Sequence, residues 1–290
     1  MSLLTRATSL LTRPAPLTAE LSRRNVLRGL GAGAAGIAAV PLLASAATAA
    51  PARHRRRPVV ADTTPHQRIL TVDGVHNLRD AGGYTTQCGG TVAWGAVYRS
   101  GALNKVTDQG LQQLQPLKLT WLVDLRTDRE RSTVGTDHIP AGAQELLAPV
   151  GDENARGGFP TVGSVSPDTL AEFRSHVTDP KQRASYGRAI NQIAENRGAP
   201  ILVHCNAGAY RTGWLTAVVL TALGVDRDQV NADFLISNDT IGAQIAFTDY
   251  LDAAFEEVDN AYDDFHQFVT DGLGVRASVI ASMRRSLIVR

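Results

Sequence analysis

Hydrophobic residues along the chain form short continuous runs that alternate with segments of helical periodicity. Two runs, 119–127 (LTWLVDLRT) and 199–204 (APILVH), are almost wholly apolar and end in polar residues, which is typical of buried parallel strands. Residues 143–152 (AQELLAPVGD) predict another strand of this kind. Gly89 and Gly90 mark the expected bend of a hairpin upstream.

Helical periodicity is found in 107–117, in 170–196 and in 212–224, and it continues with breaks to the end of the chain. The first helix begins with a threonine suited to N-capping, and the third ends at a glycine. Residues 151–169 are rich in Gly, Pro and Ser and predict a long loop. Strands that alternate with helices predict a single α/β domain, with a central, mostly parallel sheet and helices on both faces.

The first 65 residues differ in composition from the rest of the chain. Residues 1–50 combine Arg23 and Arg24, a weakly apolar run of Gly and Ala, and small residues before its end, which resembles a cleavable twin-arginine export signal. A transmembrane anchor is the alternative, but Gly and Ala contribute little transfer energy and a proline interrupts the run. Residues 51–65 predict a basic disordered linker, so the expected folded domain is 66–290.

Charge is distributed unevenly around this boundary. The whole chain has a net charge of +1, but residues 61–290 hold 20 basic and 27 acidic residues, a net charge of −7. An acidic body argues against nucleic acid as a partner, because non-specific binding to that polymer depends on neutralising phosphates. We therefore expect no nucleic-acid partner, and membrane contact only through the export signal.

One segment, 200–214 (PILVHCNAGAYRTGW), carries the clearest chemical pattern in the chain. An apolar strand places Cys205 at the carboxyl end of a sheet, where open α/β folds bind ligands. Small residues then allow consecutive N–H groups to turn inward at the start of a helix, which makes an anion site. The expected phosphate-binding set is Cys205, Asn206, Ala207, Gly208, Ala209, Tyr210 and Arg211.

Each reactive group in this segment has a physical task. The field of the loop favours a thiolate at Cys205, which makes it a nucleophile. The planar fork of Arg211 binds two phosphate oxygens and follows them into the transition state. We expect Thr212 to hydrogen-bond the thiolate and His204 to orient the loop through backbone contacts. A buried cysteine in an ordinary strand-turn-helix is the alternative, and the flanking groups argue against it.

The segment HCNAGAYRTG is similar to the Cys-x5-Arg signature of protein tyrosine and dual-specificity phosphatases. More narrowly, the chain resembles the bacterial secreted tyrosine/phosphoinositide phosphatases. The resemblance covers nearly all of residues 70–288, through NLRDAGGY, VYRSGAL, VDLRTDRE, LLAPVGD and DGLGVRASVIASMRRSL. It implies hydrolysis of phosphomonoesters through a phosphocysteine, with no metal and no cofactor, on a phosphorylated protein or small-molecule substrate.

The phosphate loop departs from this family at two positions. Members usually carry Lys-Asp before the arginine, where this chain has Ala209 and Tyr210. Loss of the lysine weakens the case for phosphoinositide substrates, and loss of the aspartate removes an acid for the leaving group. Asp152, after the strand at 143–152, is the leading replacement, and Asp124 is the second candidate, with a structural salt bridge as its alternative.

Several family positions lie outside the loop. Arg79, Asp80 and Arg99 resemble residues near the pocket, with turn caps and ion pairs at the core rim as the alternative.

Tyr210, which is in the loop itself, either stacks on an aromatic phosphoester or narrows the pocket, unless it points to solvent. Cys88, which is in a Gly-rich turn, is expected to be a plain thiol, and its pairing with Cys205 stays open.

The sequence therefore predicts an exported, cysteine-dependent protein tyrosine phosphatase located outside the cytoplasm. Phosphotyrosine-like aryl phosphates are the expected substrates. A phosphate-binding pseudophosphatase is the alternative, because the Lys-Asp pair is missing. A further alternative is a phosphatase for a small-molecule or inositol phosphate.

Overall fold

A central sheet with strand order β1-β3-β6-β4-β5 organises the computed structural model, which describes residues 66–152 and 162–290. The strands β3, β6, β4 and β5 are parallel, and β1 is antiparallel at one edge. The strands are β1 (Arg79–Asp80), β2 (Thr91–Val92), β3 (Val97–Ser100), β4 (Trp121–Asp124), β5 (Gln144–Leu147), β6 (Ile201–His204) and β7 (Ile288–Val289).

Helices follow the strands, and their ends are set by local capping residues. Thr107 accepts a hydrogen bond from the Gly110 amide at the start of the first helix, and Gly224 ends the fifth in a left-handed conformation. The helices are α1 (Asp108–Leu114), η1 (Gln115–Leu117), α2 (Asp128–Val134), α3 (Pro167–Thr178), α4 (Pro180–Glu195), α5 (Tyr210–Leu223), α6 (Arg227–Ile241), α7 (Thr248–Ala261), α8 (Phe265–Gln267), η2 (Phe268–Gly272) and α9 (Ala277–Leu287).

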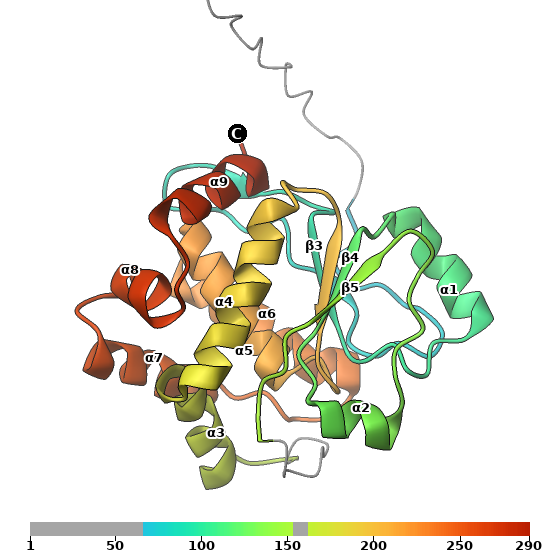
Figure 1. The fold of residues 1–290 in the computed structure, drawn as a ribbon, viewed down its shortest axis with the longest axis horizontal. Coiled ribbons are helices and arrows are strands. Elements are labelled where there is room, and N and C mark those ends of the chain that lie inside the picture. Colours follow the sequence, from blue (N-terminus) through green and yellow to red (C-terminus); the bar gives the residue numbers. More distant parts are fainter. Residues whose placement is uncertain (1–65, 153–161) are drawn as a thin grey trace, which may run out of the picture. The chain divides into compact units, whose positions relative to one another are not determined.

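Both faces of the sheet are covered, which explains why the central strands are apolar along their whole length. Leu122 and Leu202 are neighbours in register and pack with Leu114 of α1. Val123 and Val203 are also neighbours, but they point to the opposite face, against α4 and α5. Figure 1 shows β3, β4 and β5 between α1 on one side and α4 and α5 on the other. The predicted α/β architecture is confirmed.

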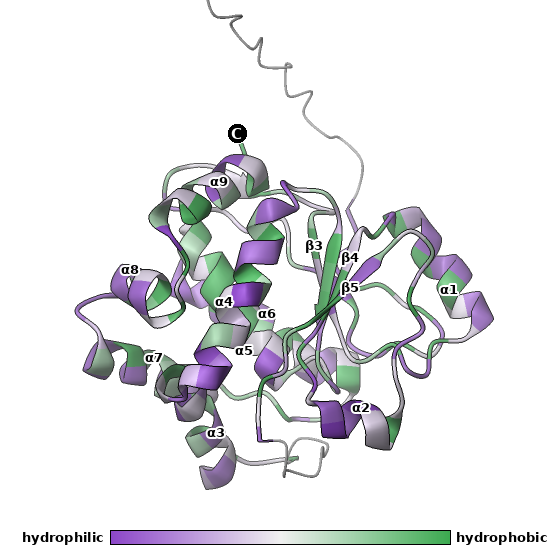
Figure 2. Cartoon of the chain, viewed as in Figure 1, coloured by the Kyte–Doolittle hydropathy of each residue, from purple (hydrophilic) through white to green (hydrophobic). Residues whose placement is uncertain are grey.

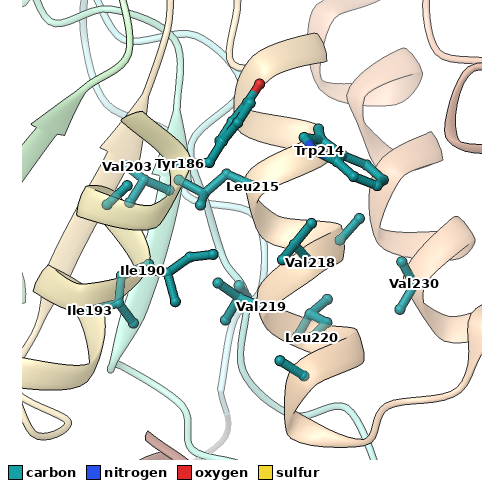
Figure 3. Packing of buried hydrophobic residues seen from close by; sticks show 14 of the residues in the cluster. Tyr186, Ile190, Ile193, Val203, Trp214, Leu215, Val218, Val219, Leu220 and Val230 are labelled. Carbon is teal, nitrogen blue, oxygen red and sulfur yellow. The ribbon is translucent and has the colours of Figure 1, made fainter. Parts of the chain in front are cut away.

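The larger core lies around α5. Its apolar residues pack against Ile190 and Ile193 of α4 and against Val203 of β6, as Figure 3 shows. Leu215 and Val219 of α5 face the same cluster. Figure 2 shows hydrophilic residues on the outward turns of α1 and α4, as expected for helices that bury only one stripe.

Two elements differ from what the sequence predicts. The strand at 143–152 is parallel, but β5 is an edge strand whose residues are mostly exposed. The helical segment 170–196 is two helices, because Pro180 forces Asp179 into an extended conformation between α3 and α4. Asp179 then caps α4 through the amide of Lys181.

The C-terminal strand pairs with a strand in the first part of the domain, and the sequence does not reveal this pairing. Thr91 and Val92 of β2 pair antiparallel with the C-terminal strand β7, while the bend around Gly89 and Gly90 is present. The described residues belong to one compact unit. The predicted export signal, the linker and part of the predicted loop (153–161) lie outside the described residues. Within 66–152 and 162–290, no helix has the length and apolarity to cross a bilayer.

Candidate active site

The cysteine loop connects the central strand β6 to the start of α5. Cys205 is 3% exposed and follows His204, whose neighbours in register are Ser100 of β3 and Asp124 of β4. The loop therefore lies at the carboxyl edge of the parallel strands, where ligands bind in open α/β sheets. The sequence predicted this position.

Neighbouring residues hold the loop by donating hydrogen bonds to its carbonyl groups. Ala102 donates its amide to the Asn206 carbonyl (2.9 Å), Asn77 donates to Ala207 (3.0 Å), and Arg99 donates to Gly208 (2.8 Å). Among the described residues, no acceptor takes up the N–H groups of 206–209. Because the carbonyls face outward, these N–H groups are left to converge on the concave side, as an anion requires.

Gly208 makes this close packing possible. Its φ is +69°, and a Cβ at this position would lie 2.2 Å from the Ser100 carbonyl oxygen. A side chain would therefore push the loop away from β3. The glycine in the signature has a geometric cause in this chain.

Two buried arginines stabilise the loop from the core rather than facing a phosphate. Arg99 and Arg79 are both fully buried and share the carboxylate of Asp233, at 2.5 and 3.4 Å. Asp80 accepts hydrogen bonds from the amides of Gly82 and Gly95 (2.7 and 2.6 Å). The structure thus places Arg79, Asp80 and Arg99 as ion pairs and turn caps, the alternative that the sequence allowed.

Arg211 is fixed by a glutamate that sequence reasoning missed. Its two terminal nitrogens donate to the two carboxylate oxygens of Glu130, at 2.6 and 2.7 Å. The side chains are 13% and 5% exposed. Burial alone would raise the pKa of Glu130, but the Arg211 guanidinium outweighs it and lowers the pKa.

The contacts of Arg211 leave one edge of its fork available. Nη1 also donates to the carbonyls of Val150 (3.1 Å) and Leu125 (3.4 Å), so its donors are used. No acceptor among the described residues binds Nε, and Nη2 has a second hydrogen. The Nε–Nη2 edge can therefore donate two parallel hydrogen bonds to a phosphate.

Glu130 also connects three parts of the site. It closes a capping box at the start of α2 with Thr127, and it accepts a hydrogen bond from the Asn206 side chain. The segment Thr127-Asp128-Arg129-Glu130 is a capping-box pattern that the sequence displays. That pattern predicts a helix start, but only the fold shows that the glutamate reaches Arg211.

Asp124 belongs to a buried ion-pair network. Arg126 donates to both oxygens of Asp124 (3.0 and 3.1 Å from Nε) and to Asp137 (2.6 Å). The side chain of Asp124 is fully buried. A fully buried carboxylate with both oxygens bound by a guanidinium has no route to a substrate, so the structure favours the structural salt bridge over the predicted acid role.

His204 is part of the same network. Its Nε2 lies 3.2 Å from Asp137, and its Nδ1 lies 3.2 Å from the Cys205 carbonyl oxygen. Burial alone would lower the pKa of His204, but Asp124 and Asp137 outweigh it and raise the pKa. The contact with the Cys205 carbonyl agrees with the predicted orienting role.

Asp124, Asp137 and His204 are close enough together to be considered as metal ligands. However, the Arg126 guanidinium already binds both carboxylates. A cation held next to this guanidinium would be repelled at short range. We interpret the cluster as an ion-pair network that supports the end of β6.

The predicted roles of Thr212 and Asp152 stay predictions. Thr212 is fully buried, and its hydroxyl has no hydrogen-bond partner among the described residues. Asp152 is exposed and lies two residues after Val150, whose carbonyl binds Arg211. The strand that ends in PVGD therefore brings Asp152 to the neighbourhood of the loop.

The side chain of Tyr210 takes none of the three positions that the sequence allowed. It is 9% exposed, and its hydroxyl donates to the Ile245 carbonyl (3.1 Å). Its ring lies 5.7 Å from that of Phe173 and 5.5 Å from that of Tyr250. The ring therefore packs against α3 and α7 and fixes the loop there. Of the groups of Tyr210, only the backbone amide is left for a phosphate.

Cys88 is far from the cysteine of the loop. The amide next to it, that of Gln87, donates to the Gly224 carbonyl at the C-terminal end of α5, whereas Cys205 precedes the N-terminal end. A helix of 14 residues is about 20 Å long. A disulfide needs Cα atoms within about 7 Å, so the fold excludes a Cys88–Cys205 pair.

Comparison with known proteins agrees with this geometry. Residues 70–289 match the Tyrosine phosphatase family. The chain is 29% identical over 248 residues to "Triple specificity protein phosphatase PtpB" of Mycobacterium tuberculosis, covering 76% of this chain and 88% of the relative. Among solved structures, P. aeruginosa TpbA is 20% identical, with a TM-score of 0.36 and coverage of 64% and 90%. The catalytic core of Siw14 is 13% identical, with a TM-score of 0.38 and coverage of 72% and 96%.

Proposed function

Because the chain belongs to the tyrosine phosphatase family, we propose that it hydrolyses aryl phosphomonoesters such as phosphotyrosine through a phosphocysteine at Cys205. The observation that carries this proposal is the loop between β6 and α5. Its carbonyls are bound from behind, and its N–H groups and the Nε–Nη2 edge of Arg211 are left for one anion. That arrangement suits the three equatorial oxygens of a phosphoryl group.

The reaction takes place in two displacements. The Cys205 thiolate attacks phosphorus, the bond to the leaving oxygen breaks, and that oxygen takes a proton from an acid beside the loop. Water then attacks the phosphocysteine, releases inorganic phosphate and regenerates the thiolate. Arg211 stabilises the negative charge of both transition states, and Glu130 holds Arg211 in place through both steps.

The loop composition supports aryl phosphates over inositol phosphates. Ala209 stands where a lysine would add positive charge for a multiply phosphorylated headgroup, and the ring of Tyr210 is turned into the core. We expect Ala209→Lys to improve the ratio of kcat/KM for inositol polyphosphates over phosphotyrosine peptides. An unchanged ratio would contradict this view of substrate preference.

The proposed chemistry is tested with p-nitrophenyl phosphate and the full chain. Cys205→Ser removes the nucleophile, so turnover is expected to fall to background, while Cys88→Ser, the matched control, keeps full activity. Mass spectrometry after rapid acid quenching is expected to detect a phosphate adduct on the peptide that contains Cys205. Turnover that survives Cys205→Ser would sink the proposal.

Export belongs to the same proposal and is supported by the sequence of residues 1–50. The expected location of the phosphatase is outside the cytoplasm, after cleavage of a twin-arginine signal. Replacement of Arg23 and Arg24 with lysine is expected to keep the full-length chain in the cytoplasmic fraction of a bacterial host. Equal amounts of the processed chain in the extracytoplasmic fraction would refute this route.

A further inference from the structure

Helix α3 places one face against the phosphate loop. Phe173 contacts Tyr210 through the two rings, whose centroids lie 5.7 Å apart, and Thr169 is buried four residues before Phe173 on the same helix. His176 packs against the ring of Tyr186, at 5.4 Å. Positions three and four apart share one face of a helix, so Glu172, three after Thr169 and four before His176, lies on this face.

The carboxyl group of Glu172 interacts with the groups of the site. Electrostatic interactions connect it to Arg211 and Glu130 on the loop side, and to Tyr186 and Tyr210 on the helix side. Thr169, Phe173 and His176 are buried, whereas Glu172 is in contact with solvent. Its exposed side chain is therefore accessible to a substrate bound beside the loop.

Tyr186 marks the same location from α4. Its ring is fully buried, its hydroxyl has no hydrogen-bond partner among the described residues, and it interacts electrostatically with Cys205, Arg211 and Glu172. Figure 3 shows this hydroxyl pointing toward the end of α5 at which Trp214 lies, which is the end that carries the loop. The Tyr186 hydroxyl thus interacts with both Glu172 and the nucleophile.

We propose that Glu172 is the general acid of the phosphatase and supplies the proton that the loop, with Tyr210 in place of an aspartate, does not supply. The inference rests on the proposed function. In the first step the protonated carboxyl group gives its proton to the leaving oxygen as the P–O bond breaks. In the second, the Glu172 carboxylate takes a proton from the attacking water, so the resting acid is restored.

The electrostatics of the site agree with this role. Desolvation by the surrounding protein raises the pKa of Glu172 although solvent still reaches its side chain; Arg211 opposes this effect, and the Glu130 carboxylate adds to it. A raised pKa keeps a larger fraction of the carboxyl group protonated toward neutral pH, as a general acid requires. Asp124, in contrast, is fully buried with both oxygens bound by Arg126, so it cannot reach a leaving group.

The test compares Glu172→Gln with Glu256→Gln, which makes the same change at an exposed position of α7. Rates are measured for p-nitrophenyl phosphate, phenyl phosphate and a phosphotyrosine peptide. A phenolate of high pKa needs the proton most, so Glu172→Gln is expected to lower kcat about 100-fold or more for phenyl phosphate and the peptide. The loss for p-nitrophenyl phosphate is expected to stay within about tenfold, because that leaving group needs the proton least.

A second readout separates chemistry from structure. The decline of kcat at high pH is expected to disappear in Glu172→Gln, and Glu172→Asp is expected to recover part of the rate for phenyl phosphate. Inhibition by vanadate is expected to be unchanged, since the loop is intact. Glu256→Gln should behave as wild type in all three measurements.

The outcomes distinguish a failure of the Glu172 role from a failure of the proposed phosphatase function. If the wild type fails to turn over every ester, the proposed function fails and the role of Glu172 fails with it. If Cys205→Ser abolishes turnover but Glu172→Gln shows equal losses for all leaving groups, or none, Glu172 is not the acid and the phosphatase assignment stands. A leaving-group-dependent loss in Asp152→Asn alone would also overturn the role of Glu172 and assign the acid to Asp152.

Discussion

The strongest single test of the site's architecture is Glu130→Gln. The change preserves the volume of the side chain and its hydrogen bond from the Thr127 amide, but it removes the charge that opposes Arg211. The amide oxygen of the glutamine still accepts a hydrogen bond from Nη1 of Arg211. The amide nitrogen, itself a donor, faces the donor Nη2 and cannot bind it. The variant therefore leaves a largely buried guanidinium without its anion.

The expected magnitude follows from the burial of the pair. Removal of one partner from a buried ion pair typically costs about 3–5 kcal/mol of unfolding free energy. The side chains of Arg211 and Glu130 are 13% and 5% exposed, and the remaining amide oxygen keeps one bond, so we expect about 3 kcal/mol. A displacement of the arginine by about 1 Å lowers kcat/KM about 100-fold.

Urea unfolding measures the first quantity, and turnover of p-nitrophenyl phosphate measures the second. Glu256→Gln on the exposed side of α7 is the matched control and is expected to change neither. Because Arg211 lowers the pKa of Glu130, the stability that Glu130 contributes is present above pH about 4.5. It is lost as the pH falls through the lowered pKa, so the difference from wild type should shrink there. A variant within about 0.5 kcal/mol of wild type, the typical effect of a surface change, and equally active would refute the role of Glu130.

Two further predictions concern residues that support the site. Burial lowers the pKa of His176 to about 4. Between pH 6.5 and 4, His176 is therefore protonated in the unfolded chain but not in the folded chain. Relative to His176→Gln, wild type should lose up to about 3 kcal/mol over this range, measured by urea unfolding at each pH; parallel profiles would contradict the assignment. Gly208→Ala should cost more than about 2 kcal/mol and most of the activity, because of strain at positive φ and the clash with Ser100. Gly242→Ala, at φ +73° with open space around it, should cost only the conformational part; equal losses would show that the close approach is unimportant.

The sequence predicted the features that depend on neighbouring residues. The apolar runs ending at Asp124 and His204 are buried parallel strands, because both faces of the sheet are covered. Gly224 ends α5 as expected. The placement of Cys205 at a strand end and of Arg211 at a helix start follows from the same local logic.

Features that depend on distant contacts were not predictable in this way. The pairing of Thr91 with Val289 joins two segments that are far apart in the sequence, and no local pattern encodes it. In the sequence, Glu130 is recognisable only as part of a helix cap. Its contact with Arg211 exists because β4 and β6 are neighbours. Glu172 has the appearance of an ordinary exposed helical residue until α3 is placed on the loop.

Tyr210 shows how one substitution in the loop affects the rest of the site. Its ring meets Phe173 of α3, and its hydroxyl binds Ile245 near the start of α7. The residue that replaces the family's aspartate is therefore also the anchor of the helix that carries Glu172. If the position of Glu172 depends on this anchor, loss of the ring should reproduce the kinetic effect of losing the acid.

Tyr210→Leu keeps apolar volume but removes the ring and the hydroxyl, whereas Tyr210→Phe removes only the hydroxyl. We expect Tyr210→Leu to lower kcat more for phenyl phosphate than for p-nitrophenyl phosphate, and Tyr210→Phe to retain most of the wild-type selectivity between them. The double variant with Glu172→Gln should lose no more for phenyl phosphate than Glu172→Gln alone, because an acid that is already absent cannot be misplaced. Additive losses would show that Tyr210 acts on the loop itself, and that α3 reaches the site without its support.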